Sequence, residues 1–268
     1  MAATLTVFEH EAVRFDWTSR DMAALERLRK RLGADVLRPT LAAGQLALQA
    51  AHYVGVVRLG QRTVQVLPKI YQSKESASEQ ERVQQATRNL LHLLAAAGQV
   101  LIREHEIAPL LQRDLDWFEI LTHLFASNLS NEWKRGASRS YQVIEDDLPV
   151  LKGKWRVAEQ FRRPERKHIF AVAYDEFTAD NPLNSVFSFV VERLWRLTSD
   201  SGNRRHLGEL RQWMDEVTLV PAMTAADAPP SLVTRLNQQY APLLNLARLF
   251  LEGSSLQLAA DDLTAFAF

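Results

Sequence analysis

The sequence predicts an α+β protein in which a small β-rich N-terminal domain is followed by a mostly helical, stalk-like region with an inserted β-hairpin. Three observations predict this class. Short β-branched runs surround a tight-turn pair within the first 75 residues, apolar residues then recur with the 3.6-residue period of helices, and residues 141–174 return to an extended pattern. With 268 residues, 47% of them hydrophobic and 24% charged, the chain can hold one large or two smaller cores.

Composition excludes several classes of protein. The 32 basic and 32 acidic side chains cancel, so any contact with nucleic acid must be local. The absence of cysteine excludes disulfides, thiolate zinc sites and a cysteine nucleophile, and it fits a reducing cytoplasm. The N-terminus lacks a basic segment followed by an apolar run, and no stretch of about 18 apolar residues occurs. We therefore expect a cytoplasmic protein that is neither secreted nor membrane-spanning.

Residues 1–75 form the predicted N-terminal domain, which we expect to dock on a partner. One helix with a single apolar face ends at Gly33. Residues 53–67 contain two β-branched-rich runs around Gly60-Gln61, a pair that suits a two-residue hairpin turn. The polar stretch at residues 72–80 is the best linker candidate, and we place a boundary there.

Residues 76–252 form the predicted helical region. The helix that ends at Gly136 is apolar on more than one face, so we expect it to be central and buried. The Asn181-Pro182 pair is a strong helix start, because a capping side chain precedes a proline at the first helical position. The apolar repeat in residues 183–197 implies a bundle partner. Between these helices, residues of about 140–175 are predicted to be extended.

Residues 253–268 are predicted to begin a further, C-terminal domain. Residues 264–268 alternate alanine and phenylalanine like a strand that enters a sheet. The chain stops there without a turn or a polar tail, so we interpret this segment as the start of a truncated domain.

No motif for nucleotide binding or catalysis is found in the sequence. Leu151-Lys152-Gly153-Lys154 lacks the glycine spacing of a phosphate loop, and no GxSxG motif is present. The seven histidines are scattered and form no metal-ligand pair, and no Asp/Glu-x-Lys triplet accompanies the acidic run at residues 145–147. We therefore predict no catalytic residue, metal site or cofactor in this chain.

A basic strip at residues 152–168 is the most distinctive charged feature. Trp155 and Phe161 are interleaved with it, and only two glutamates oppose it. Such a strip can follow a phosphate backbone or an acidic protein surface, although a solvated hairpin accounts for it equally well. The residues that we consider for DNA or phosphate contact are Lys152, Lys154, Arg156, Arg162, Arg163, Arg166 and Lys167.

Two blocks of the same region carry a resemblance to a known family. Residues 141–155 contain an L-x-G-K/R core, and residues 170–184 contain the pattern Y-D-E-x-x-x-D-x-x-L-N. Together they resemble the McrC family, the nuclease-bearing partner of the AAA+ GTPase McrB in restriction of modified DNA. Weaker similarity covers residues 53–70 and 240–253. The signature residues, which we predict to be structural, are Gly153, Tyr174, Asp175, Glu176, Asp180, Asn181 and Asn184.

The resemblance implies a β-rich domain and helical stalk that engage the centre of a McrB hexamer, and a C-terminal PD-(D/E)xK nuclease domain. This chain ends where that nuclease domain would begin, so the implied DNA cleavage resides in a missing domain. The implied role is a subunit of a modified-cytosine-dependent restriction endonuclease that docks on the GTPase hexamer, stimulates its GTP hydrolysis and meets modified DNA through the complex. GTP and magnesium are then expected on the partner or on the missing domain.

The residues leave three interpretations open. A docking subunit is the leading one, with Arg58, Arg62 and Lys69 around the N-terminal hairpin as contact candidates, although solvated strand-edge charges explain these three as well. A stand-alone DNA-binding protein that uses residues 152–168 is the second. An enzyme whose active site carries no recognisable motif is the third.

Overall fold

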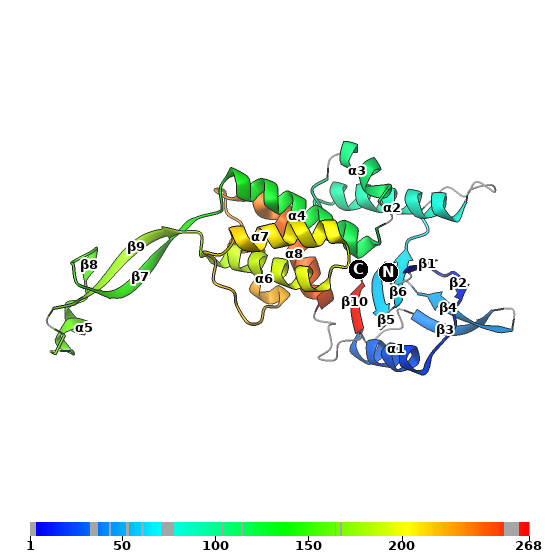
Figure 1. Cartoon of the computed structure of the whole chain (residues 1–268), viewed down its shortest axis with the longest axis horizontal. Helices are drawn as coiled ribbons and strands as arrows, with labels where there is room; N and C mark the ends of the chain where they lie inside the picture. Colours follow the sequence, from blue (N-terminus) through cyan, green and yellow to red (C-terminus); the bar gives the residue numbers. More distant parts are fainter. Residues whose placement is uncertain are drawn as a thin grey trace.

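The computed structural model describes residues 4–32, 37–42, 44–51, 54–59, 62–70, 78–102, 104–113, 115–163, 165–166, 168–254 and 263–267. Three parts follow one another along its longest axis (Figure 1): a β-rich head, a helical bundle, and a two-stranded arm that projects from the far end of the bundle. The predicted α+β class with an inserted hairpin is confirmed.

The head contains two small sheets and one helix. The first sheet has the order β1 (Thr4–Phe8), β6 (Arg62–Leu67), β5 (Gly55–Leu59) and β10 (Leu263–Ala267). The second has the order β2 (Ala12–Arg14), β4 (Gln45–Ala50) and β3 (Leu37–Ala42). Strand β1 is parallel to β6, and the other pairs are antiparallel. Helix α1 (Ser19–Leu32) contributes to a core with Val7, Phe15, Leu25, Leu48, Val57, Val64 and Val66.

The last strand pairs with a segment that is distant in the sequence. A strand is present at residues 263–267, but it pairs antiparallel with β5, from Leu263 opposite Leu59 to Ala267 opposite Gly55. This strand therefore belongs to the N-terminal sheet, and the start of a C-terminal domain at residues 253–268 remains a prediction. Backbone donors and acceptors at the open edge of β5 can accept a strand from anywhere in the chain, and local sequence pattern does not say which. The domain boundaries near residues 75 and 252 remain predictions.

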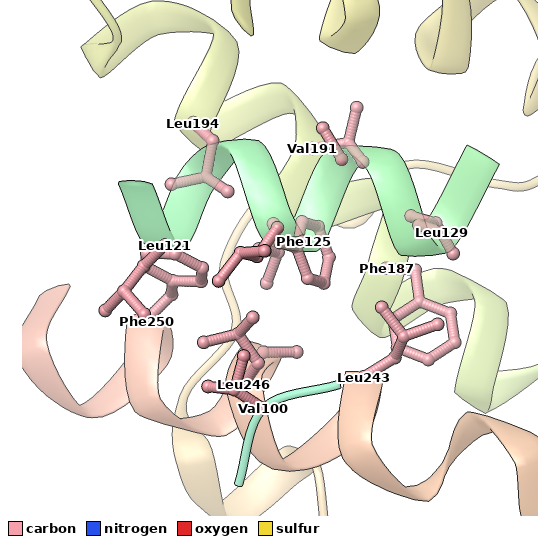
Figure 2. Packing of buried hydrophobic residues seen from close by; sticks show 14 of the residues in the cluster. Val100, Leu121, Phe125, Leu129, Phe187, Val191, Leu194, Leu243, Leu246 and Phe250 are labelled. Atoms are coloured by element: carbon pink, nitrogen blue, oxygen red, sulfur yellow. The ribbon is translucent and has the colours of Figure 1, made fainter. Parts of the chain in front are cut away.

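The middle of the molecule is helical. Its helices are α2 (Glu79–Ala96), α3 (Glu104–Leu111), α4 (Trp117–Arg135), α6 (Pro182–Leu197), α7 (Ser201–Trp213) and α8 (Ala241–Ser254), with short 3-10 turns at Ala225–Asp227, Pro230–Leu232 and Gln238–Tyr240. Helix α4 is the central one, as predicted. In Figure 2 its Leu121, Phe125 and Leu129 meet side chains of α6 and α8, such as Phe187 and Phe250.

Helix α4 connects the head to the arm. At its N-terminal end, the Trp117 backbone N–H donates to Oε1 of buried Gln65 in β6 at 2.6 Å. Val56 of β5 belongs to the same hydrophobic cluster as the bundle. The C-terminal end of α4 is capped at Gly136, from which the chain continues into the arm (Figure 1). One buried helix thus joins the head to the root of the arm.

The contact between α4 and α7 contains a half-buried histidine. Nδ1 of His123 lies 3.1 Å from Nη1 of Arg113 and 3.2 Å from Oδ1 of Asn203, and the His206 ring centroid is 6.0 Å away. Burial, and then the charge of Arg113, lower the pKa of His123 below its ordinary value of 6.5. The folded state therefore favours the neutral imidazole.

This shift predicts a pH dependence of stability. A lowered pKa contributes stability that is present above pH 6.5 and is lost as the pH falls through the folded-state value. We expect the free energy of unfolding, measured in urea, to fall more between neutral and mildly acidic pH for the parent chain than for His123→Gln. His92→Gln, which changes an exposed histidine of α2, is the control and should follow the parent. Parallel curves for all three proteins would contradict the prediction.

Candidate functional site

The arm is a regular antiparallel ribbon. Strands β7 (Ser140–Leu148) and β9 (Phe170–Thr178) pair over nine residues each, from Ser140 opposite Thr178 to Leu148 opposite Phe170. A short strand β8 (Lys154–Trp155) pairs with β9, and the one-turn helix α5 (Val157–Phe161) lies beside it near the tip. In Figure 1 the arm extends away from the bundle, at the end opposite to the head. The described residues of the bundle core include no side chain from the arm.

At the tip, the two sequence blocks of the resemblance contact each other. Gly153 has a φ of 69°, and a Cβ there would lie 2.5 Å from the Ala173 carbonyl oxygen and 2.7 Å from Cβ of Tyr174. Glycine is therefore required both by the backbone angle and by the close approach to β9. The neighbouring Lys152 places Nζ 3.5 Å from the centroid of the Tyr174 ring, a cation–π contact. These contacts support a structural role for Gly153 and Tyr174, which remains a prediction.

Most of the basic strip is neutralised inside the arm. Arg156 pairs with Glu145 at 3.0 Å, and Arg163 and Arg166 share Asp147 at 3.1 and 2.9 Å. Arg162 pairs with Glu159, Lys154 is exposed, and Lys167 lies outside the described residues. The seven basic residues of the arm are matched by seven acidic ones, namely Glu145, Asp146, Asp147, Glu159, Glu165, Asp175 and Glu176. The arm therefore carries no net charge that would attract a phosphate backbone.

The arm exposes large apolar side chains. Phe161 on α5 is 78% exposed, and Trp155 on β8 is 43% exposed. Nearer the bundle, Tyr141 and Phe177 stack with ring centroids 4.9 Å apart on the same face. The exposed apolar side chains of the arm are Tyr141, Val143, Val150, Leu151, Trp155, Val157, Phe161 and Phe177. Apolar side chains gathered in this way on a projecting element are typical of a surface that binds protein.

Where the arm joins the bundle, the predicted helix start at Asn181-Pro182 is confirmed. The Asn181 side chain accepts from the Asn184 backbone N–H at 3.0 Å and caps α6. Asp180 accepts from the backbone N–H and hydroxyl of Thr218 at 3.0 and 2.6 Å. Asp175 and Glu176, by contrast, lie exposed on β9.

The docking candidates of the head are engaged within the head. Nη1 of Arg62 donates to the Asp16 carbonyl at 2.6 Å, and its guanidinium lies 5.2 Å from the centroid of the Phe15 ring. Lys69 pairs with Glu11 at 3.0 Å. Arg58 lies in β5, opposite Thr63 of β6, and its side chain is outside the described part of the structure. These contacts favour a structural interpretation of Arg62 and Lys69.

Sequence reasoning missed Ser138 and Gln142, two of the residues that hold the arm at its root. The Ser138 carbonyl accepts two side-chain amides, and Gln142 donates to the Asp180 carbonyl. A backbone carbonyl leaves no trace in a sequence, so Ser138 carries no signal. The alternation of exposed Tyr141 and Val143 along β7 was the available signal for an apolar face.

Within the described ranges, no helix is long and apolar enough to cross a membrane. In the same ranges, no three histidine or acidic side chains lie together in a way that would hold a metal ion.

Comparison with known proteins places the chain in a family. The model of the McrBC 5-methylcytosine restriction system component matches residues 48–268. The chain belongs to this family. The resemblance inferred from the two sequence blocks is thereby confirmed. A comparison with curated protein sequences finds no match.

Two solved structures are similar to this member of the McrBC family. A chain in the cryo-EM structure of the Thermococcus gammatolerans McrBC complex has 25% sequence identity and a TM-score of 0.74, and the match covers 92% of this chain and 80% of that one. A chain in the refined half-complex from a tetradecameric assembly of Thermococcus gammatolerans McrB AAA+ hexamers with bound McrC has 26% identity and a TM-score of 0.74. That match covers 92% of this chain and 64% of the other.

Proposed function

We propose that the chain is an McrC-like subunit of a modified-cytosine-dependent restriction complex, in which it docks on an McrB-type AAA+ GTPase hexamer and stimulates GTP hydrolysis. The shared fold with a chain from an assembly of McrB hexamers with bound McrC supports this role. In this proposal DNA cleavage resides in a domain outside this chain, and GTP and magnesium are bound by the partner or by that domain. The cytoplasm is the proposed location, in keeping with a chain that lacks cysteine.

The arm is the element that we assign to docking, and its exposed apolar tip is the observation that carries the assignment. Phe161 and Trp155 stand on a ribbon that extends beyond the bundle (Figure 1). Aromatic side chains of this kind provide most of the free energy at protein interfaces. The sequence-based expectation placed docking in residues 1–75, but Arg62 and Lys69 there are already engaged within the head.

Stimulation can follow from docking without any catalytic group on the arm. A bound protein shifts the equilibrium between conformations of its partner when it binds one conformation more tightly than the others. GTP hydrolysis depends on the alignment of phosphate, magnesium and water by residues of the GTPase. An arm that binds best to the aligned conformation therefore raises turnover.

The test compares GTP turnover by an McrB-type hexamer with and without this chain. We expect an increase on the order of tenfold, within the usual range of coupling between sites. A double variant of the tip, Trp155→Ser with Phe161→Ser, should lose this increase and weaken binding by at least about tenfold, since both lost anchors are aromatic.

Leu41→Ser with Leu46→Ser is the matched control, because these leucines are a cross-strand pair of exposed apolar residues on the head. The control should stimulate like the parent. If the head variant loses stimulation and the tip variant retains it, docking belongs to the head and the assignment to the arm is wrong.

The second candidate, DNA binding by residues 152–168, is favoured by the exposure of Lys154 and Arg162 on the arm. It predicts that the chain alone shifts methylated or unmodified DNA in a gel, and that salt weakens this binding steeply. Because the charges of the arm cancel, we expect no shift at physiological salt. The contact with modified DNA is then made through the complex.

A further inference from the structure

The segment that enters the arm is held by two side chains of the segment that follows it. The chain enters the arm after Gly136 and leaves it before α6. Nδ2 of Asn181 and Nδ2 of Asn184 both donate to the Ser138 carbonyl, at 2.8 and 2.7 Å. We call these three residues the root clamp.

Asn184 also reaches the departing strand. Its Nδ2 donates to the Ala179 carbonyl at 2.7 Å, one residue beyond the end of β9. Asn184 is 0% exposed and lies on α6 beside Leu183 and Phe187, which belong to the bundle core. One buried amide thus ties the entering and the departing segments of the arm to a helix that cannot move independently of the bundle.

Without the clamp, fewer contacts fix the direction of the arm. The connection from α4 contains Gly136 at a φ of 132°, followed by three residues without regular structure. The other contacts at this place are the Tyr240 hydroxyl, which donates to the Gly136 carbonyl at 3.1 Å, the Gln142 amide, which donates to the Asp180 carbonyl, and the exposed pairs of Asp180 with Thr218 and of Arg139 with Glu216. Of these bonds, the one from Asn184 to the Ala179 carbonyl is buried, and buried hydrogen bonds are harder to replace by water than exposed ones, so Asn184 should contribute most.

We propose that Asn184, assisted by Asn181, is a positioning residue that sets the direction of the arm relative to the bundle, and that stimulation of the GTPase depends on this direction. The second half of the proposal rests on the proposed function. A freely swivelling arm contacts several conformations of the partner about equally well. It therefore still binds, but it loses the difference in affinity that shifts the partner toward its active conformation.

The direction of the arm can be measured without a partner. Because the chain contains no cysteine, spin labels can be attached specifically at Ala158→Cys on α5 and Gln212→Cys on α7, two exposed positions. Pulsed dipolar spectroscopy should give one narrow distance distribution for the parent and a broad one for Asn184→Ala. Asn181→Asp keeps an acceptor for the helix cap but loses the donor to Ser138, so it should broaden the distribution without unfolding α6.

Val190→Ala is the matched control. It removes a buried side chain from the same helix, where it lowers the free energy of unfolding without touching the clamp. It should keep the narrow distribution and the full stimulation of GTP turnover. Asn184→Ala should keep affinity for the hexamer within about threefold while maximal turnover falls by about tenfold.

Two results would overturn the proposal. If Asn184→Ala and Asn181→Asp give distance distributions as narrow as that of the parent, the clamp does not set the direction of the arm. If these variants give broad distributions but stimulate GTP turnover as much as the parent, stimulation does not depend on the direction of the arm. If the parent chain itself does not stimulate, the proposed function fails and the dependence on direction with it, while the distances still decide whether the clamp orients the arm.

Discussion

Replacing residues 141–177 by a two-residue Asn-Gly turn should abolish binding to the hexamer and stimulation of its GTP turnover, while the free energy of unfolding stays within about 1 kcal/mol of the parent. Ser140 and Thr178 are Cα partners in the ribbon, so a two-residue hairpin turn can join them. The clamp residues Ser138, Asn181 and Asn184 remain in the shortened chain. The side chains removed are absent from the described core of the bundle, so little buried area is lost there.

Turnover, binding and urea unfolding of the shortened chain together check this expectation. A shortened chain that unfolds like the parent but no longer binds would assign docking to the arm itself rather than to a disturbed bundle. If the shortened chain still stimulates the GTPase, docking belongs to the head. The hairpin that exposes Leu41 and Leu46 would then be the next surface to mutate.

The features predicted correctly from the sequence are governed by short-range rules. Asn181-Pro182 begins α6 because a side-chain cap and a fixed proline φ act within one helical turn. Helix α4 was expected to be central because its apolar residues cover more than one face, and they do meet α6 and α8. The resemblance singled out Gly153 and Tyr174 but not the contact between them, and the close approach to β9 now gives Gly153 a steric reason.

The features that were not predicted depend on pairing between distant segments. Strand β10 has the alternation of a strand, but nothing in residues 263–267 specifies β5 as its partner. The charges of residues 152–168 looked basic because their acidic partners, Glu145 and Asp147, precede the strip and meet it only when the ribbon folds. The length of the arm also depends on which residues of β7 and β9 lie opposite each other, since the two strands stay paired over their full extent.

The surroundings of Glu119 were also not predicted from the sequence, because they depend on contacts between distant segments. In the sequence it is an acidic residue of the first turn of a helix, a place where a negative charge is ordinarily exposed and favoured by the helix dipole. In the structure it is 3% exposed, at the contact of α4 with the link between α6 and α7. Its carboxylate accepts from Thr198 Oγ1 at 2.6 Å, from the Ser199 backbone N–H at 2.7 Å and from Asn203 Nδ2 at 2.8 Å.

Replacing Glu119 by Ala should therefore lower the free energy of unfolding by about 3 kcal/mol, the range for loss of one member of a buried charged network. The substitution leaves the Thr198 hydroxyl, the Ser199 N–H and one donor of Asn203 without their acceptor in a site that water hardly reaches. Glu119→Gln should lower the free energy of unfolding by roughly half as much. The glutamine side-chain oxygen still accepts a hydrogen bond, but its amide nitrogen, itself a donor, would face other donors.

Glu216→Ala is the matched control, since the Glu216 side chain is 44% exposed and pairs with the exposed Arg139 at 3.1 Å. An exposed ion pair contributes less than about 1 kcal/mol, so this variant should unfold close to the parent in urea. Equal midpoints for the Glu119 and Glu216 variants would mean that the α6–α7 link is held by apolar packing alone. A large loss confined to Glu119 would show that one buried carboxylate organises the link, because it accepts hydrogen bonds from both backbone and side-chain donors there.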